Sequence, residues 1–393
     1  MIIRERWLKK IRPFYDSELI KVITGIRRCG KSVILKQISN EINADDSHKI
    51  MINFEDMQFN SIQDEISLYN YIKSLIKDTQ KYYLFFDEIQ NVTGYERAIN
   101  SFRLLNTSIF ITGSNAHLLS GELATMLSGR YISFKIMPFS FAESMEIQGI
   151  KNPDDKDLMN YLRYGGMPQR FLMNSEDELK VFFSDLYDSI ILKDIVARYK
   201  IQNIDLLKRI FTYLARTTSQ LFSASSITKF LKNEGRDCSK ESLYNYISYI
   251  IASCVMNKAP RYDIRGKRVL ATLEKYYLAD ISFAYLNTSK LDIGASLENI
   301  VYNELLCRGY DVSVGILRDA EIDFIAEKGN EKLYFQVCYL LASEDTIQRE
   351  FGAYKKVSDN YPKYVLSTDK YDFSQDGIVH YNLIDWLVGY EQH

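Results

Sequence analysis

The sequence has 393 residues, enough for two to four domains, with 46% hydrophobic and 25% charged residues and a net charge of −2 at pH 7. This charge balance excludes a generally basic nucleic-acid binder, so nucleic-acid contact would need a local patch. The five cysteines form no CxxC pair and the four histidines are scattered, which argues against a disulfide framework and a zinc or histidine metal site. We therefore expect a reducing, cytoplasmic location, and no apolar stretch approaches the length of a membrane span.

Short apolar runs alternate with segments of helical spacing between residues 20 and 136. The runs that read as strands are LIKVIT, KIMINF, YYLFFD, SIFITG and YISFKI, and helical spacing recurs at 31–43, 64–78, 95–105 and 116–128. This alternation is typical of an α/β fold, a parallel sheet with covering helices. We expect this domain to span 1–150 and a helical linker or lid to follow at 151–203.

A phosphate-binding pattern, GxxxxGK[ST], lies between the first strand and the first helix. Its residues are Gly25, Ile26, Arg27, Arg28, Cys29, Gly30, Lys31 and Ser32, with Val33 following. The glycines let the loop wrap a phosphate with backbone N–H groups, Lys31 reaches the terminal phosphates, and Ser32 coordinates Mg²⁺ at the helix start. A basic strand–helix turn is the alternative, but the strand before and the helix after favour a nucleotide site.

Two acidic residues end the strand in KYYLFFDEIQNV. Asp87 closes a buried apolar run, where a carboxylate is costly unless it meets a cation, so we expect it to hold Mg²⁺ through water. Glu88 is then the natural base to polarise the attacking water. The sequence thus predicts a metal and catalytic edge beside the phosphate loop.

Further candidates follow the next two strands. Asn115 ends SIFITGSN, where it either orients the water or senses the γ-phosphate, or caps the helix that begins at 116. Arg130 in LSGRY is the best candidate for an arginine finger, because the transition-state charge needs a fixed cation. Arg27 and Arg28, within the loop itself, are alternatives for that role.

The segments TGIRRCGKS, LFFDEIQ, ITGSN, LSGRY and PFSF resemble, in order and spacing, a large prokaryotic family of AAA-type ATPases, over nearly the whole chain. In that family the ATPase domain is followed by helical and winged-helix parts and a restriction-endonuclease-like domain. The resemblance implies Mg-ATP as the nucleotide and an inserted strand beside the strand that leads into the phosphate loop. AAA-type proteins often form rings, so Arg130 is also a candidate for action on a neighbouring copy in a homo-oligomer.

From about residue 204 the pattern changes to three helices and two extended runs, typical of a winged helix at 204–285. Residues 201–280 hold 13 Lys and Arg against 7 Asp and Glu, a balance of +6. The positive turn at Arg265, Lys267 and Arg268, with Arg261 before it, favours contact with the phosphates of double-stranded DNA. The helix ESLYNYISYII is rich in Tyr and Ile, which suits a protein partner at least as well.

The last region, 290–393, has the layout of PD-(D/E)xK nucleases, in which carboxylates bind Mg²⁺ and a lysine supports the attacking water. The matching positions are Glu298 (with Glu304 as an alternative on the same helix), Asp323, Gln336 and Cys338. A thiol at the lysine position supplies no fixed positive charge and suits Mg²⁺ poorly. Lys328 or Lys332 would have to substitute. We therefore expect a nuclease-like domain that has lost cleavage.

Together these patterns predict an ATPase switch in which hydrolysis of Mg-ATP rearranges the C-terminal domains. Double-stranded DNA is the first candidate for the partner. Two alternatives stay open, an ATP-regulated protein-interaction switch that does not bind DNA and a nuclease gated by ATP.

Overall fold

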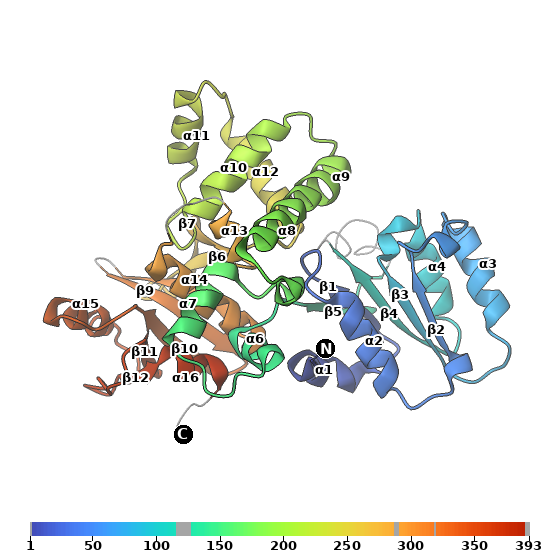
Figure 1. Cartoon of the computed structure of the whole chain (residues 1–393), viewed down its shortest axis with the longest axis horizontal. Coiled ribbons are helices and arrows are strands. Elements are labelled where there is room, and N and C mark those ends of the chain that lie inside the picture. The colour runs from blue at the N-terminus through green and yellow to red at the C-terminus, as the bar shows by residue number, and fades with distance from the viewer. Residues whose placement is uncertain (1, 115–126, 287–290, 318–319, 390–393) are drawn as a thin grey trace. The chain divides into compact units, whose positions relative to one another are not determined.

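The computed structural model describes residues 2–114, 127–286, 291–317 and 320–389 (Figure 1). The chain divides into two compact units. The first unit comprises Met1–Met137 with Ala252–Cys254, and the second comprises Pro138–Ile251 with Val255–His393.

A five-stranded parallel sheet with the order β2-β3-β4-β1-β5 forms the first unit. Its strands are β1 (Ile20–Thr24), β2 (Lys49–Asn53), β3 (Tyr82–Asp87), β4 (Thr107–Gly113) and β5 (Tyr131–Lys135). The strands β1, β3 and β4 are buried along their whole length, as expected of a parallel sheet covered on both faces. The predicted sheet is thus confirmed, and β4 is the strand inserted beside β1.

Helices cover both faces of this sheet. They are α1 (Glu5–Ile11), α2 (Lys31–Glu41), α3 (Glu65–Leu75) and α4 (Tyr95–Phe102), with the 3₁₀ turns η1 (Arg12–Phe14), η2 (Asp46–His48), η3 (Met57–Phe59) and η4 (Ile89–Asn91). The neighbouring helices α3 and α4 share one core with alternate residues of the strands, whereas α2 packs against β3 and β4. The helix expected at 116–128 falls mostly outside the described residues.

Helices make up the first part of the second unit. They are α6 (Phe141–Gln148), α7 (Asp155–Tyr164), η6 (Pro168–Leu172), α8 (Glu176–Ser189), the π-helix η7 (Ile190–Val196), α9 (Ala197–Tyr199), α10 (Ile204–Arg216), α11 (Ala224–Asn233) and α12 (Lys240–Ala252). Ser140 and Asp154 begin α6 and α7 with capping boxes. Before α12, the Ser239 hydroxyl accepts the backbone N–H of Ser242 at 3.0 Å, the cap that their spacing predicts.

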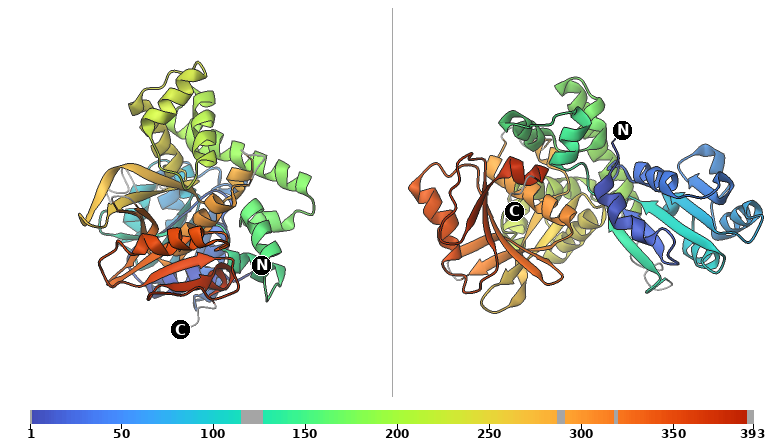
Figure 2. Two further views of the ribbon diagram at one scale, coloured as in Figure 1. Left: turned by 90° about the vertical axis from the view of Figure 1, so that its left-hand side faces the viewer. Right: turned by 90° about the horizontal axis from the view of Figure 1, so that it is seen from below.

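A seven-stranded mixed sheet, drawn from gold to red in Figure 2, forms the rest of this unit in the order β12-β11-β10-β9-β8-β6-β7. Its strands are β6 (Met256–Asp263), β7 (Arg268–Leu278), β8 (Asp311–Leu317), β9 (Ala320–Lys328), β10 (Glu331–Val337), β11 (Lys363–Ser367) and β12 (Val379–Asn382). The accompanying helices are α13 (Ser282–Tyr285), α14 (Ile293–Arg308), α15 (Glu344–Tyr354) and α16 (Leu383–Val388).

The hairpin β6–β7 belongs to the same sheet as the C-terminal strands. The strand β6 pairs in parallel with β8, from Arg261 opposite Val314 to Asp263 opposite Ile316. The three helices and the hairpin expected at 204–285 are present, but hydrogen bonds of the sheet cross the boundary expected between 285 and 290. The winged-helix and nuclease-like domains therefore stay predictions, and the hairpin is tied directly to the second of them.

Candidate functional site

The phosphate loop joins β1 to α2, and two glycines shape it. Gly25 has a φ of 151°, and a Cβ there would lie 2.3 Å from the carbonyl oxygen of Ile136. Gly30 has a φ of 100° and precedes the first residue of α2. Because residues with a Cβ rarely adopt such positive φ values, both positions require glycine, as the sequence pattern predicts.

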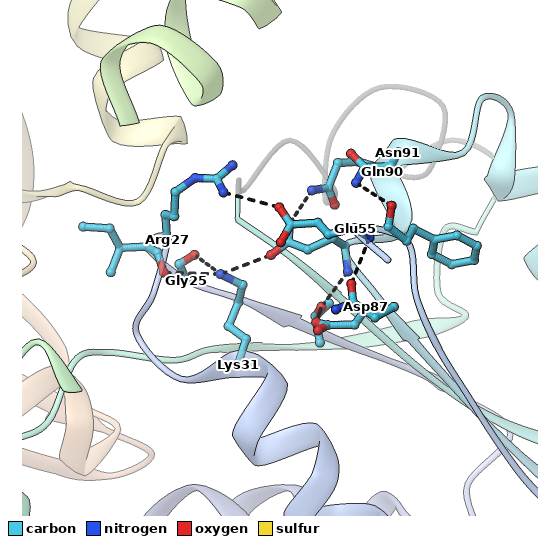
Figure 3. Close-up of polar contacts among 12 residues, drawn as sticks. Gly25, Arg27, Lys31, Glu55, Asp87, Gln90 and Asn91 are labelled. Carbon is cyan, nitrogen blue, oxygen red and sulfur yellow. Dashed lines mark hydrogen bonds and ion pairs between the residues drawn. The ribbon is translucent and has the colours of Figure 1, made fainter. Parts of the chain in front are cut away.

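The ammonium of Lys31 is held inside this loop (Figure 3). Its side chain is only 4% exposed, and Nζ donates hydrogen bonds to the carbonyl oxygens of Gly25 at 3.1 Å and Ile26 at 3.3 Å. The same nitrogen lies 3.8 Å from Oε1 of Glu88. Ser32, the next residue, is exposed in the first turn of α2.

Asp87 and Glu88 lie at the carboxyl end of β3, and a residue of β4 connects them. The Thr112 hydroxyl donates a hydrogen bond to Oδ1 of Asp87, and it accepts the backbone N–H of Glu88 at 3.0 Å. Glu88 has a φ of 54°, a region that costs a non-glycine residue about 1 kcal/mol or more. Thr112 thus fixes both acidic residues, a role that sequence reasoning missed.

The Glu88 carboxylate is oriented from two sides. Its Oε2 accepts a hydrogen bond from the side-chain amide of Gln90, and Oε1 faces the ammonium of Lys31. The Glu88 carboxylate is therefore held as a hydrogen-bond acceptor beside the phosphate loop.

Two further polar contacts lie near this carboxylate. Arg27 Nη1 lies 3.5 Å from Oε1 of Glu55, and the amide of Asn91 donates to the Phe54 carbonyl at 3.3 Å (Figure 3).

The structure brings together the predicted residues that follow β1, β3 and β4. These three strands are parallel neighbours, so the loop from Gly25, the Asp87 carboxylate and the buried Ser114 share one edge of the sheet. Asn115 lies outside the described residues. A buried lysine, an exposed serine hydroxyl and a buried aspartate at one edge fit the phosphates and Mg²⁺ of a bound nucleotide.

Arg130 lies at the opposite edge of the sheet. Its carbonyl oxygen accepts the N–H of Ile20, the first residue of β1, at 3.0 Å, and its Nη1 donates to Oδ1 of Asn100 at 3.3 Å. Strand β1 separates this edge from the phosphate loop by five residues, about 16 Å. The structure therefore does not bring Arg130 to the phosphate loop of its own chain, and action on a neighbouring copy stays a prediction.

Behind the phosphate loop lies Arg4, which sequence reasoning also missed. Its side chain is almost completely buried, and Nη1 donates to the carbonyl oxygens of Cys29 at 3.1 Å and Met137 at 3.0 Å. The Cys29 thiol donates to the Ile136 carbonyl at 3.5 Å. The loop is thus fastened to the N-terminal segment and to the chain just after β5.

A second group of predicted residues meets in the second unit. A pocket of about 560 Å³ is lined by residues of α14, β9, β10 and α15, including Glu298, Asp323 and Gln336. Burial raises the pKa of the Asp323 carboxyl well above its usual range, and the neighbouring Glu298 adds to the rise. Cys338 is buried in the core beside β11 rather than presented to solvent.

The other residues predicted for this nuclease-like site, Glu304, Lys328 and Lys332, make contacts outside the pocket. Glu304 pairs with Arg308 at 2.9 Å, and Lys332 pairs with Glu327 at 3.3 Å. Lys328 donates to the carbonyl oxygen of Arg308 at 3.0 Å. None of these contacts places the side chain in the pocket lined by Glu298 and Asp323.

A lysine of β7 instead contacts two of the carboxylates that line this pocket. Lys275 Nζ lies 3.0 Å from Oε1 of Glu298 and 2.6 Å from Oε1 of Glu321, and the Tyr277 hydroxyl donates to the same oxygen of Glu298 at 2.6 Å. Burial lowers the pKa of Lys275, but the two carboxylates outweigh it, so this pKa lies above its ordinary value. Sequence reasoning missed Lys275 because it searched only the C-terminal region.

The hairpin turn exposes the cations that the sequence predicts there. Arg265, Lys267 and Arg268 are exposed, and Arg268 lies 3.8 Å from an oxygen of Asp263. The helix α12 turns its apolar residues Leu243, Ile247 and Ile250 inward. Its exposed residues are all polar or amphipathic, namely Lys240, Glu241, Ser242, Tyr244, Asn245 and Ser248. The outward face of α12 is therefore more polar than its composition suggests.

Comparison with known proteins shows which families this chain resembles. Residues 17–145 match the model of an AAA domain, and residues 155–292 match a domain of unknown function (DUF8612). An uncharacterized protein of Haemophilus influenzae is 37% identical over 99% of both chains, and one of Methanocaldococcus jannaschii is 32% identical over 86% of this chain and 78% of its own. The chain belongs to the family of these two proteins.

A solved structure agrees with the fold. The Walker-type ATPase PABY2304 of Pyrococcus abyssi aligns with a TM-score of 0.50 and 14% identity, over 73% of this chain and 96% of its own. At this identity the likeness concerns the fold, and with the family match it confirms an AAA-type, P-loop ATPase domain. In the described part of the chain, no helix has the length and apolar character needed to cross a membrane.

Proposed function

We propose that the chain binds Mg-ATP at the phosphate loop and hydrolyses it to ADP and phosphate. One observation carries the proposal. The buried ammonium of Lys31 faces Glu88 at 3.8 Å, beside the buried carboxylate of Asp87. A cation for the phosphates, an acid for the metal and a base for water thus lie at one edge of the sheet.

Each side chain then has a defined task. Lys31 neutralises the terminal phosphates. Ser32 and Asp87 would hold Mg²⁺, which would supply charge stabilisation at the phosphoryl oxygens. Glu88 accepts a proton from the water that attacks the γ-phosphorus, while the bond between that phosphorus and the oxygen of ADP breaks. Gln90 keeps the Glu88 carboxylate oriented through its amide.

We further propose that hydrolysis switches the second unit between conformations, with double-stranded DNA as partner. The exposed cations of the hairpin turn and the balance of +6 over residues 201–280 support this choice. The exposed Ser242, Asn245 and Ser248 of α12 support it too, because Ser and Asn side chains hydrogen-bond to base edges. A protein partner is the second candidate, favoured by the exposed Tyr244 on that same face.

Titration calorimetry with ATP in the presence of Mg²⁺ tests the site. Wild type is expected to bind, and Lys31→Ala to lose at least tenfold in affinity, about 1.4 kcal/mol, because the phosphates lose their buried cation. Lys9→Ala, which removes an exposed lysine of α1, is the control and keeps the wild-type affinity. Equal binding by wild type and Lys31→Ala would contradict the assignment.

A further inference from the structure

The pocket between α14, β9, β10 and α15 has the acidic lining that a nuclease-like fold uses for a divalent metal. Its lining includes the carboxylates of Glu298, Glu321, Asp323 and Glu350, the amide of Gln336, and the cations Arg349 and Lys356. Such a fold implies Mg²⁺, which prefers several oxygen ligands in near-octahedral geometry. The contacts of these side chains decide whether the pocket fits that ion.

Lys275 already supplies a positive charge here. Its side chain is 5% exposed, and its ammonium contacts Glu298 at 3.0 Å and Glu321 at 2.6 Å. A lysine buried to this extent is stable only when carboxylates compensate its charge, and these two do so. To bind a divalent ion, Glu298 and Glu321 would have to give up their ion pairs with this buried ammonium, which would leave its charge without compensation.

Several other oxygens of the pocket also accept hydrogen bonds or form ion pairs. One oxygen of Asp323 accepts the N–H of Val337 at 2.8 Å, and the amide oxygen of Gln336 accepts the N–H of Asp323 at 2.6 Å. The Gln336 nitrogen donates to Glu350 at 3.3 Å, and Arg349 pairs with that carboxylate at 2.7 Å. Among the described residues, no three His, Cys, Asp or Glu side chains are arranged to hold a metal ion. The residues therefore do not fit Mg²⁺.

We propose that the ammonium of Lys275 is a permanent counter-ion of Glu298 and Glu321, in place of a divalent metal, and that the pocket takes up no divalent cation. The hairpin strand β7 is then pinned to α14 and β9 by an ion pair rather than by a metal. The C-terminal region contributes its shape and its contacts, not metal-dependent cleavage. This inference is independent of the ATPase proposal, because its residues all belong to the second unit.

Binding of Mn²⁺ to the full-length chain, followed by electron paramagnetic resonance of the free ion, tests this assignment. The background is Asp87→Asn without nucleotide, which removes the carboxylate beside the phosphate loop. This parent is expected to bind no Mn²⁺ at concentrations up to about 1 mM. Adding Lys275→Met removes the positive charge that compensates Glu298 and Glu321, so Mn²⁺ binding is expected to appear within that concentration range.

Two controls isolate the role of Lys275. Lys275→Arg keeps the positive charge and is expected to gain no Mn²⁺ binding. Lys332→Met removes another largely buried lysine, from β10, and is expected to gain none either. A folded Lys275→Met variant without Mn²⁺ binding would overturn the assignment, and near-ultraviolet circular dichroism reports the fold.

One measurement needs no variant of Lys275. If the Asp87→Asn parent binds Mn²⁺, and the additional substitution Asp323→Asn abolishes that binding, the proposal is overturned. Nicking of supercoiled plasmid by wild type with Mn²⁺, absent in Asp323→Asn, would do the same. The proposal predicts neither binding nor nicking.

Discussion

The guanidinium of Arg4 donates a hydrogen bond to the carbonyl oxygen of Cys29, 3.1 Å away, and so joins the N-terminal segment to the phosphate loop. The same nitrogen contacts the Met137 carbonyl at 3.0 Å, and the Arg4 side chain is almost completely buried. One buried cation therefore holds the back of the loop against the chain that follows β5. We expect this support to matter for nucleotide affinity.

Replacement of Arg4 by methionine tests that support. The substitution leaves the carbonyl oxygens of Cys29 and Met137 without this donor, and each unpaired buried group costs about 1–3 kcal/mol. Affinity for ATP is expected to fall about tenfold or more, and Arg4→Lys to recover part of it. The control is Arg12→Met, because Arg12 pairs with Glu5 and Glu41 at the surface. An ATP affinity of Arg4→Met equal to that of wild type would refute the prediction.

Thr112→Val should act on turnover rather than on binding. The hydroxyl holds Asp87 and the backbone of Glu88 together, and a hydrogen bond to a charged group is worth about 1.5–3 kcal/mol. We expect the kcat for ATP hydrolysis to fall about 10- to 100-fold, with KM little changed. Thr112→Ser keeps the hydroxyl and should keep most of the activity; if Ser and Val behave alike, the hydroxyl has no such role.

The buried Lys21 of β1 predicts a dependence of stability on pH. Its ammonium contacts the Ser108 hydroxyl at 2.7 Å, and burial lowers its pKa to about 7 from 10.5. Between these two pH values the unfolded chain binds a proton that the folded chain does not. The free energy of unfolding should therefore rise as pH increases from 7 toward 10.5, by a few kcal/mol, about 3–5 in all.

Urea unfolding between pH 7 and 9 measures this slope. The sequence contains two tryptophans, so Trp7 reports the first unit in a Trp386→Phe background. Lys21→Met in the same background should remove most of the rise in the free energy of unfolding. The same slope with and without Lys21 would assign the pH dependence to other groups.

Removal of the hairpin cations tests the choice of DNA as partner. The triple variant Arg265→Gln, Lys267→Gln and Arg268→Gln should weaken binding to a mixed-sequence duplex and reduce the salt slope of log K by up to about 3. A matched triple replaces exposed lysines elsewhere, namely Lys9, Lys151 and Lys193. Fluorescence anisotropy at several salt concentrations gives both values, and absence of any duplex binding by wild type would turn the search to protein partners.

Much of the first unit could be predicted from the sequence, because its signals are local. The apolar runs of β1, β3 and β4 and the glycines around Lys31 each lie within a few residues of the feature they define. Arg4 and Thr112 could not be predicted in the same way. Their partners lie between 24 and 133 positions away, and their roles depend on packing and on the register of neighbouring strands.

In the second unit, too, local features could be predicted from the sequence, whereas contacts between distant segments could not. The strand β9 and the helix α14 were predictable from their patterns, and Glu298 and Asp323 line one pocket. The pairing of β6 with β8, however, is set by tertiary structure, and it brings Lys275 into a pocket assigned to a different part of the chain. The sequence around Cys338 therefore gives no indication of Lys275, which lies in β7.

Steady-state phosphate release from ATP by wild type and Glu88→Gln tests whether Glu88 is the catalytic base. Glutamine keeps the shape of the side chain but cannot accept the proton of the attacking water. Our account predicts turnover by wild type and a loss of about 100-fold or more in Glu88→Gln, with ATP still bound by both. Equal turnover by the two proteins, or none by wild type although ATP binds, would contradict the role of Glu88 as the catalytic base.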